Sequence, residues 1–170
     1  MPDISRIYLI GFMGSGKTTL GKELARTIGY GFVDLDELIA EKAGKPVTDI
    51  FRDDGETAFR VLEQKTLTDT LTRQKVVVAT GGGTPCYFNN MALMNDCGTT
   101  IYLCYSVKTL LFHLNDETHK RPLLSGKKPV ELAEYIQVML NEREHFYRQA
   151  HFIFKESEIG LAQIRLRTGL

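Results

Sequence analysis

Residues 11–18 read Gly-Phe-Met-Gly-Ser-Gly-Lys-Thr and fit the pattern G-x-x-x-x-G-K-[ST]. Glycines let a backbone approach a ligand closely and adopt positive φ, and the N-terminus of a helix attracts anions through its free N–H groups and its dipole. The pattern therefore predicts a phosphate-binding loop of a nucleotide site. The predicted nucleotide-binding residues are Gly14, Ser15, Gly16, Lys17, Thr18 and Thr19. Lys17 is expected to act in catalysis by reaching the β- and γ-phosphates, and Thr18 is expected to hold Mg²⁺.

The residues on either side of this loop support the prediction. The apolar run 7–10 precedes it and is typical of a short buried strand. Leu20, Leu24 and Ile28 follow it at the spacing of an amphipathic helix. A glycine-rich turn with a chance lysine is the alternative, but it would not require a strand before it and a helix after it.

Two carboxylates follow the second predicted strand, Asp34 and Asp36. In many nucleotide-binding proteins the acid that holds magnesium ends a buried strand, but the strand 76–79 is followed by Thr80 and glycines. Asp34 is therefore the nearest candidate for the metal ligand, acting through water. One of the two carboxylates would serve the metal and the other a substrate hydroxyl. If the backbone stays extended, both side chains point the same way. The alternative is a pair of exposed acids that stabilise a helix start.

Two arginines indicate a small anionic substrate. Arg143 falls on the apolar stripe of a helix over residues 130–149, and Arg60 shares a helix face with Leu67 and Leu71. A half-buried guanidinium is costly unless it is paired, and it can grip a carboxylate or phosphate with two hydrogen bonds. The alternatives for Arg143 are a structural ion pair or a side chain that extends to water. The glycine triplet Gly81, Gly82 and Gly83 follows the third strand and would let a ligand approach the backbone.

Residues 115–129 are polar and basic and are predicted to form a mobile lid rather than a regular element. Arg121 would then act in catalysis by meeting the transferring phosphate when the lid closes over ATP. A solvated surface loop is the alternative. His113, His145 and His151 lack spaced partners and are interpreted as structural.

The elements that must position these residues alternate between strand and helix. Predicted strands lie near residues 7–10, 32–34, 76–79, 101–105 and 152–154. Predicted helices follow the phosphate-binding loop, lie near residues 38–43, 47–51, 56–72, 107–114 and 130–149, and close the chain after the last strand. This alternation favours an α/β fold with a five-stranded parallel sheet and helices on both faces. Ligands of such sheets bind at the carboxyl ends of the strands, where the P-loop, the two aspartates and the glycine triplet all fall.

Composition limits the range of functions. The chain has 170 residues, which predicts one domain over residues 1–170. Its 21 basic residues balance its 21 acidic ones, so neither nucleic acid nor a membrane surface is an expected partner. No apolar run is long enough to span a bilayer, and the three cysteines suggest reduced thiols in a cytoplasmic protein. We expect a monomer.

Taken together, these residues resemble the shikimate kinase family over nearly the whole chain. The matching residues are 11–19, Asp34-Leu35-Asp36, Gly55-Glu56, Phe59-Arg60, Gly81-Gly82-Gly83, Arg121-Pro122-Leu123-Leu124, Arg143, Tyr147 and Ala150. The resemblance implies a P-loop fold like that of nucleoside monophosphate kinases, with substrate-binding helices at about 34–72. It also implies transfer of the γ-phosphoryl group of ATP to the 3-hydroxyl of shikimate, on the pathway to chorismate and the aromatic amino acids.

The resemblance implies residue roles as well. Asp36 would bind ring hydroxyls and accept the proton, Arg60 and Arg143 would hold the shikimate carboxylate with the glycine triplet, and Arg121 would come from the lid. One position departs from the family: Leu114 stands where members often carry an arginine that packs on adenine. The residues that contact adenine are therefore left unassigned, with His113 and Lys120 as the alternatives for that contact.

Two other functions are alternatives for a chain with this loop. Another small-molecule P-loop kinase, such as a gluconate or nucleoside monophosphate kinase, would share the loop and the paired arginines but differ in its acceptor. A GTP-dependent switch protein would usually carry N-K-x-D and D-x-x-G, and neither pattern occurs in the chain.

Overall fold

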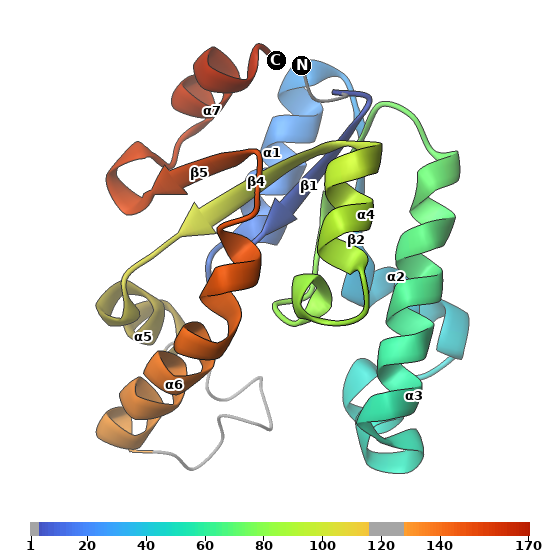
Figure 1. Cartoon of the computed structure of the whole chain (residues 1–170), viewed down its shortest axis with the longest axis vertical. Coiled ribbons are helices and arrows are strands. Elements are labelled where there is room, and N and C mark those ends of the chain that lie inside the picture. Colours follow the sequence, from blue (N-terminus) through green and yellow to red (C-terminus); the bar gives the residue numbers. More distant parts are fainter. Residues whose placement is uncertain (1–3, 116–127) are drawn as a thin grey trace.

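The computed structural model describes residues 4–115 and 128–170. Its centre is a parallel sheet in the strand order β2-β3-β1-β4-β5 (Figure 1). The strands are β1 Arg6–Ile10, β2 Gly31–Asp34, β3 Val76–Ala79, β4 Thr99–Cys104 and β5 Phe152–Lys155. The fold class is the predicted α/β one, with five parallel strands.

Helices connect the strands. They are α1 Lys17–Ile28, α2 Leu35–Ala43, α3 Val47–Asp69, α4 Asn90–Cys97, α5 Val107–Asn115, α6 Pro129–Tyr147 and α7 Leu161–Thr168. Short 3₁₀ turns occur at Thr70–Thr72, Thr84–Cys86 and Glu156–Glu158. Helices α3 and α6 extend on opposite sides of the sheet's carboxyl end, so the strand ends lie between them (Figure 1).

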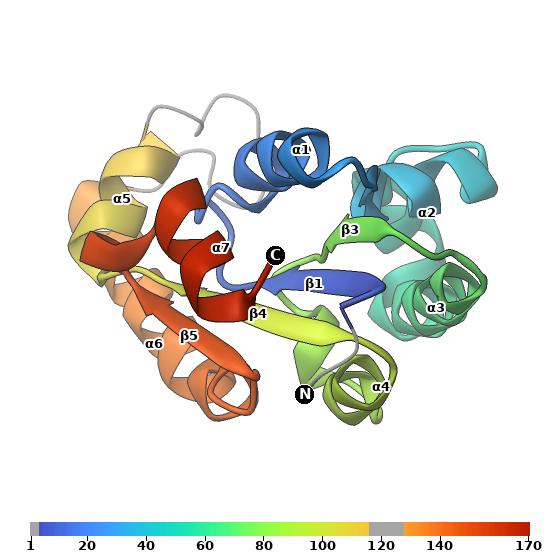
Figure 2. The same cartoon turned by 90° about the horizontal axis from the view of Figure 1, so that it is seen from above.

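The strands are apolar because both faces of the sheet are covered by helices. On one face Ile7, Leu9 and Val77 pack against Leu24 of α1 and Ile164 of α7. On the other face the strands pack against helices α2 to α6 in a larger cluster. Figure 2 shows α1 and α4 on opposite sides of the sheet. Covered in this way, the sheet holds the ends of its strands rigidly, which is what a binding site at that edge requires.

Three local predictions differ from the structure. The helical pieces on either side of residue 55 form one kinked element, since Gly55 takes a non-helical conformation at φ 83° inside α3. Helix α4 was not predicted, because residues 90–97 lack a clear apolar stripe. Finally, the backbone after Asp34 does not stay extended, since α2 begins at Leu35.

The structure bears on two further expectations. None of the helices in residues 4–115 and 128–170 is long and apolar enough to cross a membrane. Cys86, Cys97 and Cys104 are free thiols.

Candidate active site

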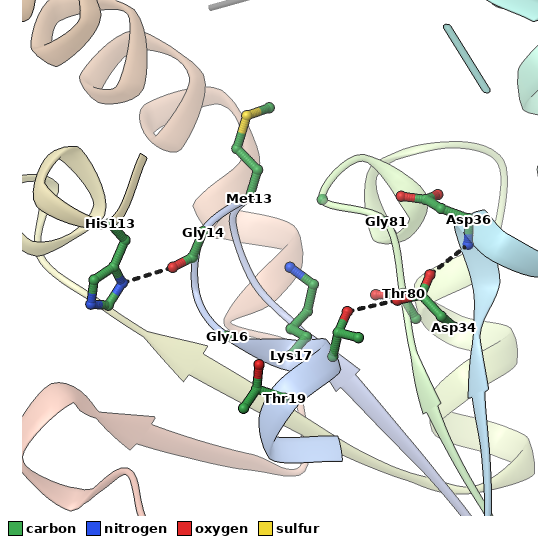
Figure 3. Close-up of a pocket in the computed structure, with 12 residues that line it drawn as sticks. Met13, Gly14, Gly16, Lys17, Thr19, Asp34, Asp36, Thr80, Gly81 and His113 are labelled. Carbon is green, nitrogen blue, oxygen red and sulfur yellow. Dashed lines mark hydrogen bonds between the residues drawn. The ribbon is translucent and has the colours of Figure 1, made fainter. Parts of the chain in front are cut away.

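A cavity of about 420 Å³ opens at the carboxyl ends of β1, β2 and β3 (Figure 3). Its walls come from the loop after β1, the start of α2 and the glycine triplet after β3. The lining residues are Met13, Gly14, Gly16, Lys17, Thr18, Thr19, Asp34, Asp36, Thr80, Gly81, Gly82 and His113. The features that the sequence predicted at separate strand ends therefore meet in one place.

The loop after β1 wraps around the lysine side chain. Gly14 and Gly16 adopt φ of 78° and 77°, conformations that favour glycine. Helix α1 begins at Lys17, so the loop leads directly into a helix N-terminus that attracts anions. The ammonium of Lys17 donates to the carbonyl oxygens of Gly11 and Phe12, both at 2.8 Å, and the residue is only 9% exposed. A buried cation beside a helix N-terminus suits the binding of a polyphosphate.

Thr18 and Asp34 supply a donor set that fits Mg²⁺. The hydroxyl of Thr18 donates to Oδ2 of Asp34 at 2.6 Å. Oδ1 of the same carboxylate caps α2 by accepting from the backbone N–H groups of Asp36 and Glu37, at 3.1 and 3.3 Å. Mg²⁺ is usually held by one or two protein oxygens together with phosphates and water. A fixed carboxylate next to a hydroxyl, at the edge of a phosphate loop, agrees with that chemistry.

Asp36 lies in the first turn of α2 and is exposed to the cavity. It faces the glycine triplet, because a methyl group placed on Gly81 would lie 3.0 Å from Oδ1 of Asp36. Asp36 reaches the cavity although the backbone is helical rather than extended at this point. The two carboxylates thus point to different partners: Asp34 points toward Thr18, and Asp36 points toward Gly81 (Figure 3).

Arg60 is buried in α3, as expected, and two carboxylates hold it. Its Nη1 donates to Glu63 at 2.9 Å, and its Nη2 donates to Glu56 at 3.1 Å. Glu63, itself 1% exposed, also accepts a 2.6 Å hydrogen bond from the hydroxyl of Thr84. The guanidinium stacks on the ring of Tyr87, with its central carbon 4.0 Å from the ring centroid. Its position is therefore fixed from several sides.

Arg60 and its neighbouring carboxylates stabilise each other in their charged forms. Burial alone would lower the pKa of Arg60, but the neighbouring carboxylates Glu63 and Glu56 outweigh it, so the pKa is raised. The pKa of Glu56 is lowered, because its carboxylate accepts hydrogen bonds from the hydroxyl of Tyr87 and from Arg60. The arginine is therefore a permanent cation beside the site.

Arg143 approaches the glycine triplet from α6. A methyl group on Gly82 would lie 3.3 Å from Nη1 of Arg143, and one on Gly83 would lie 2.6 Å from Nη1 of Arg60. The guanidinium of Arg143 also lies over the ring of Phe12, 5.6 Å from its centroid. The two arginines therefore flank neighbouring glycines, and Gly82 itself lines the cavity. This convergence of two cations on one wall suits a small anion.

Tyr147 of α6 holds the glycine triplet by a hydrogen bond to its backbone. Its hydroxyl donates to the carbonyl oxygen of Gly82 at 2.6 Å, and its ring packs against Tyr102. Burial raises the pKa of Tyr147, so the hydroxyl keeps its proton and stays a donor. Burial likewise raises the pKa of the nearby Cys86 thiol to about 11. Neither group is suited to act as a base.

The family model for shikimate kinase matches residues 13–164. The chain belongs to the shikimate kinase family. A curated shikimate kinase from Phocaeicola vulgatus is 46% identical over 156 residues, which cover 92% of this chain and 89% of that protein. The same activity is named for a Bacteroides fragilis relative that is 46% identical over 149 residues, covering 88% of this chain and 83% of that protein.

Solved shikimate kinases share the fold. A crystal structure of the enzyme from Bacteroides thetaiotaomicron aligns with a TM-score of 0.93 at 38% identity, covering 97% of this chain and 98% of that chain. A shikimate kinase from Acinetobacter baumannii, solved in complex with shikimate, aligns with a TM-score of 0.85 at 32% identity, covering 98% of this chain and 94% of that chain. The resemblance inferred from the motifs is therefore confirmed.

Membership of the shikimate kinase family makes this chain an ATP-dependent kinase whose acceptor is a hydroxyl group of shikimate. The sequence left open another small-molecule P-loop kinase, such as a gluconate kinase. The family match decides in favour of shikimate kinase.

Some residues of the site were not predicted from the sequence, and one predicted residue lies outside the part of the chain that the structure describes. Glu63 and Tyr87 hold Arg60, and neither belongs to a recognisable motif. His113 was interpreted as structural but lines the cavity, while His151 is structural as expected and contacts Thr100. Arg121 and most of the predicted lid 115–129 lie outside the described residues.

Proposed function

We propose that this shikimate kinase uses its cavity as a single site for both substrates. Arg60, Arg143 and the triplet Gly81, Gly82 and Gly83 would hold the carboxylate of shikimate. That anchor would turn the 3-hydroxyl toward Asp36. The residues of the P-loop, Gly14 to Thr19, would hold the phosphates of ATP. The anion and the nucleotide then meet across a distance short enough for direct transfer.

Phosphoryl transfer needs positioning and neutralisation of charge more than covalent chemistry. Lys17 would offset charge on the phosphate oxygens, and Asp36 would orient the acceptor hydroxyl and take its proton. Thr18 and Asp34, the latter through water, would hold Mg²⁺, which when bound neutralises the phosphate oxygens. Arg121 is proposed to add a further cation at the transferring phosphate, as the family resemblance implies.

One observation carries this proposal. Two guanidinium groups from different helices, α3 and α6, flank the same glycine triplet, and two glycines of that triplet, Gly81 and Gly82, line the cavity together with Lys17. Ion pairs that serve only stability would not need to converge on a backbone without side chains. A carboxylate-bearing acceptor explains both the paired cations and the glycines between them.

The decisive experiment compares acceptors in a coupled assay of ADP release. Shikimate, gluconate and AMP are supplied at equal concentrations, with Mg²⁺ and ATP. We expect turnover with shikimate and only background rates with the other two. Turnover with gluconate at a comparable rate would contradict the proposed acceptor site. Omitting Mg²⁺ in the presence of a chelator should abolish turnover.

We further propose that the enzyme works in the cytoplasm as a monomer with a single domain. The free thiols and the balanced charge support the cytoplasmic location. Sedimentation at micromolar concentration would test the oligomeric state.

A further inference from the structure

His113 makes a contact that none of the roles above uses. Its Nδ1 lies 2.8 Å from the carbonyl oxygen of Gly14, in the middle of the P-loop, although 99 residues separate the two in sequence (Figure 3). A carbonyl oxygen can only accept a hydrogen bond, so Nδ1 must carry the proton and donate it. This fixes the tautomer of the neutral ring and ties α5 to the loop.

The carbonyl of Gly14 belongs to a peptide plane in the middle of the phosphate-binding loop. In a planar trans peptide the C=O bond and the next N–H bond point in opposite directions, so the direction of the Gly14 carbonyl sets that of the Ser15 N–H. That N–H donates to the carbonyl oxygen of Phe12 at 3.2 Å. His113 and Phe12 therefore hold the two ends of one peptide plane. Without His113, only the hydrogen bond from Ser15 to Phe12 would hold this plane, and the permissive backbone of Gly14 would let it turn more easily.

The helix that carries His113 is itself held in place. Glu156, which follows β5, accepts hydrogen bonds from the backbone N–H of Ser106 and the hydroxyl of Thr109 at the start of α5. Near the other end, Leu114 is fully buried, and a methyl group on Gly14 would lie 2.9 Å from its side chain. The ring of Tyr105 meets the His113 ring edge-on, with centroids 5.5 Å apart. The imidazole is thus presented to the loop by a fixed support.

From these contacts we infer that His113 is a positioning residue for ATP, which holds the Gly14–Ser15 peptide of the P-loop in its phosphate-binding orientation. The two neighbouring residues have different contacts with Gly14. Leu114 packs against its α-carbon, and His113 donates a hydrogen bond to its carbonyl oxygen. The inference rests on the proposed role of this loop as the ATP site. It assigns a nucleotide function to a residue of α5 next to Leu114, the position where family members often have an arginine.

Four variants separate the hydrogen bond from the ring. In His113→Asn the side-chain amide nitrogen stands at the position of Nδ1 and can still donate, whereas His113→Phe keeps a ring but cannot donate. His113→Ala removes both, and His145→Ala removes an exposed histidine from α6 as the matched control. For each variant, KM for ATP, KM for shikimate, kcat and the Kd for Mg·ADP are measured.

We expect His113→Ala and His113→Phe to raise KM for ATP and Kd for ADP about three- to tenfold, the scale of one hydrogen bond. KM for shikimate and kcat should change by less than about twofold, a split that general loss of folding would not produce. His113→Asn and His145→Ala should stay close to the wild type. The backbone amide resonance of Ser15 should shift in the Ala and Phe variants and remain in place in the Asn variant.

Three results would overturn the inference. The first is a Phe variant that binds ADP as the wild type does while the Asn variant fails, since the ring and not the donor would then matter. The second is an equal rise in both KM values. The third is an unchanged Ser15 resonance in every variant. A wild-type enzyme that does not bind Mg·ADP at all would instead refute the proposed nucleotide site, and the inference with it.

Discussion

The charged residues at this site each contact a different partner, which indicates a different role for each. Lys17 is surrounded by loop carbonyls, Asp34 is committed to Thr18 and to capping α2, and Asp36 is the carboxylate that faces the triplet. Their side chains are close together, yet each contacts a different partner. Substitutions at these positions should therefore produce different kinetic signatures.

Lys17→Ala should lower kcat at least ~100-fold, the scale of one electrostatic contact to a transition state. The ammonium is the cation placed deepest in the loop, so its loss leaves phosphate charge without compensation. Steady-state kinetics with saturating ATP and shikimate measures the effect. Lys22→Ala, on the same helix but beside the ring of Phe32, is the control and should turn over normally. Near-normal turnover of the Lys17 variant would refute its assigned role.

Asp36→Asn should fold normally and fail in turnover. Asparagine keeps the shape of the side chain and its ability to hydrogen-bond a hydroxyl, but it cannot accept a proton from it. Circular dichroism and Kd for shikimate should be close to those of the wild type, while kcat falls. Full activity of this variant would rule out Asp36 as the proton acceptor.

Among the secondary-structure elements, α3, α6 and the segment after β3 form a unit. Arg60 comes from α3, Arg143 and Tyr147 from α6, and all three contact the glycines that follow β3. The unit leaves no space for side chains on the triplet. It also depends on Glu63, which joins Arg60 to Thr84 across two elements.

Gly83→Ala should disturb the substrate anchor. Its methyl group would lie 2.6 to 2.9 Å from three atoms of the Arg60 guanidinium, which must move away. We expect KM for shikimate to rise clearly more than KM for ATP. Gly160→Ala is the matched control, because nothing lies within 4 Å of the added methyl group and the backbone is extended there. If the Gly83 variant raises both KM values equally, the triplet does not serve the acceptor alone.

Glu63→Ala should destabilise the fold far more than Glu56→Ala. Glu63 is 1% exposed, and removing it leaves a buried cation with part of its pairing lost, which costs about 3–5 kcal/mol. The side chain of Glu56 is 55% exposed, so its ion pair is screened by water and should contribute less than ~1 kcal/mol. Urea unfolding measures both changes. Similar losses of free energy in the two variants would mean that burial does not decide the strength of these pairs.

The sequence predicted the parts of this unit but not the way they join. Apolar runs and strand–helix alternation were enough for the sheet, and the stripe on α6 was enough to place Arg143 on its inner face. Glu63 could not be found, since its importance comes from contacts with Arg60 and Thr84 that only the fold creates. Helix α4 escaped because its residues carry little apolar periodicity. The contact of His113 with the P-loop was not predicted, because its partner is a backbone carbonyl, that of Gly14, and a pattern of side chains contains no information on such a partner.

At the scale of the whole molecule, the proposed function has the two substrates bind one edge of the sheet through separate walls. The ATP wall follows β1, and the acceptor wall follows β3 and is completed by α3 and α6. A ligand that binds only the folded state stabilises it by RT ln(1 + [L]/Kd), which is about 2.7 kcal/mol at a hundredfold excess over Kd. Each substrate should therefore raise the melting temperature. ATP should do so through its contacts with the loop after β1, and the acceptor through its contacts with the residues that follow β3.

Arg143→Ala tests this division in the intact molecule. Because the variant loses one of two cations at the acceptor wall, shikimate at a fixed concentration should lose most of the stabilisation that it gives the wild type, which for a chain of this size amounts to roughly 5–10 °C. Mg·ADP should still raise the melting temperature as it does in the wild type, since the P-loop is untouched. Thermal unfolding with each ligand alone measures both effects, and KM for shikimate should rise in parallel. Equal loss of stabilisation by both ligands would show that Arg143 supports the whole cavity and that the two walls are not independent.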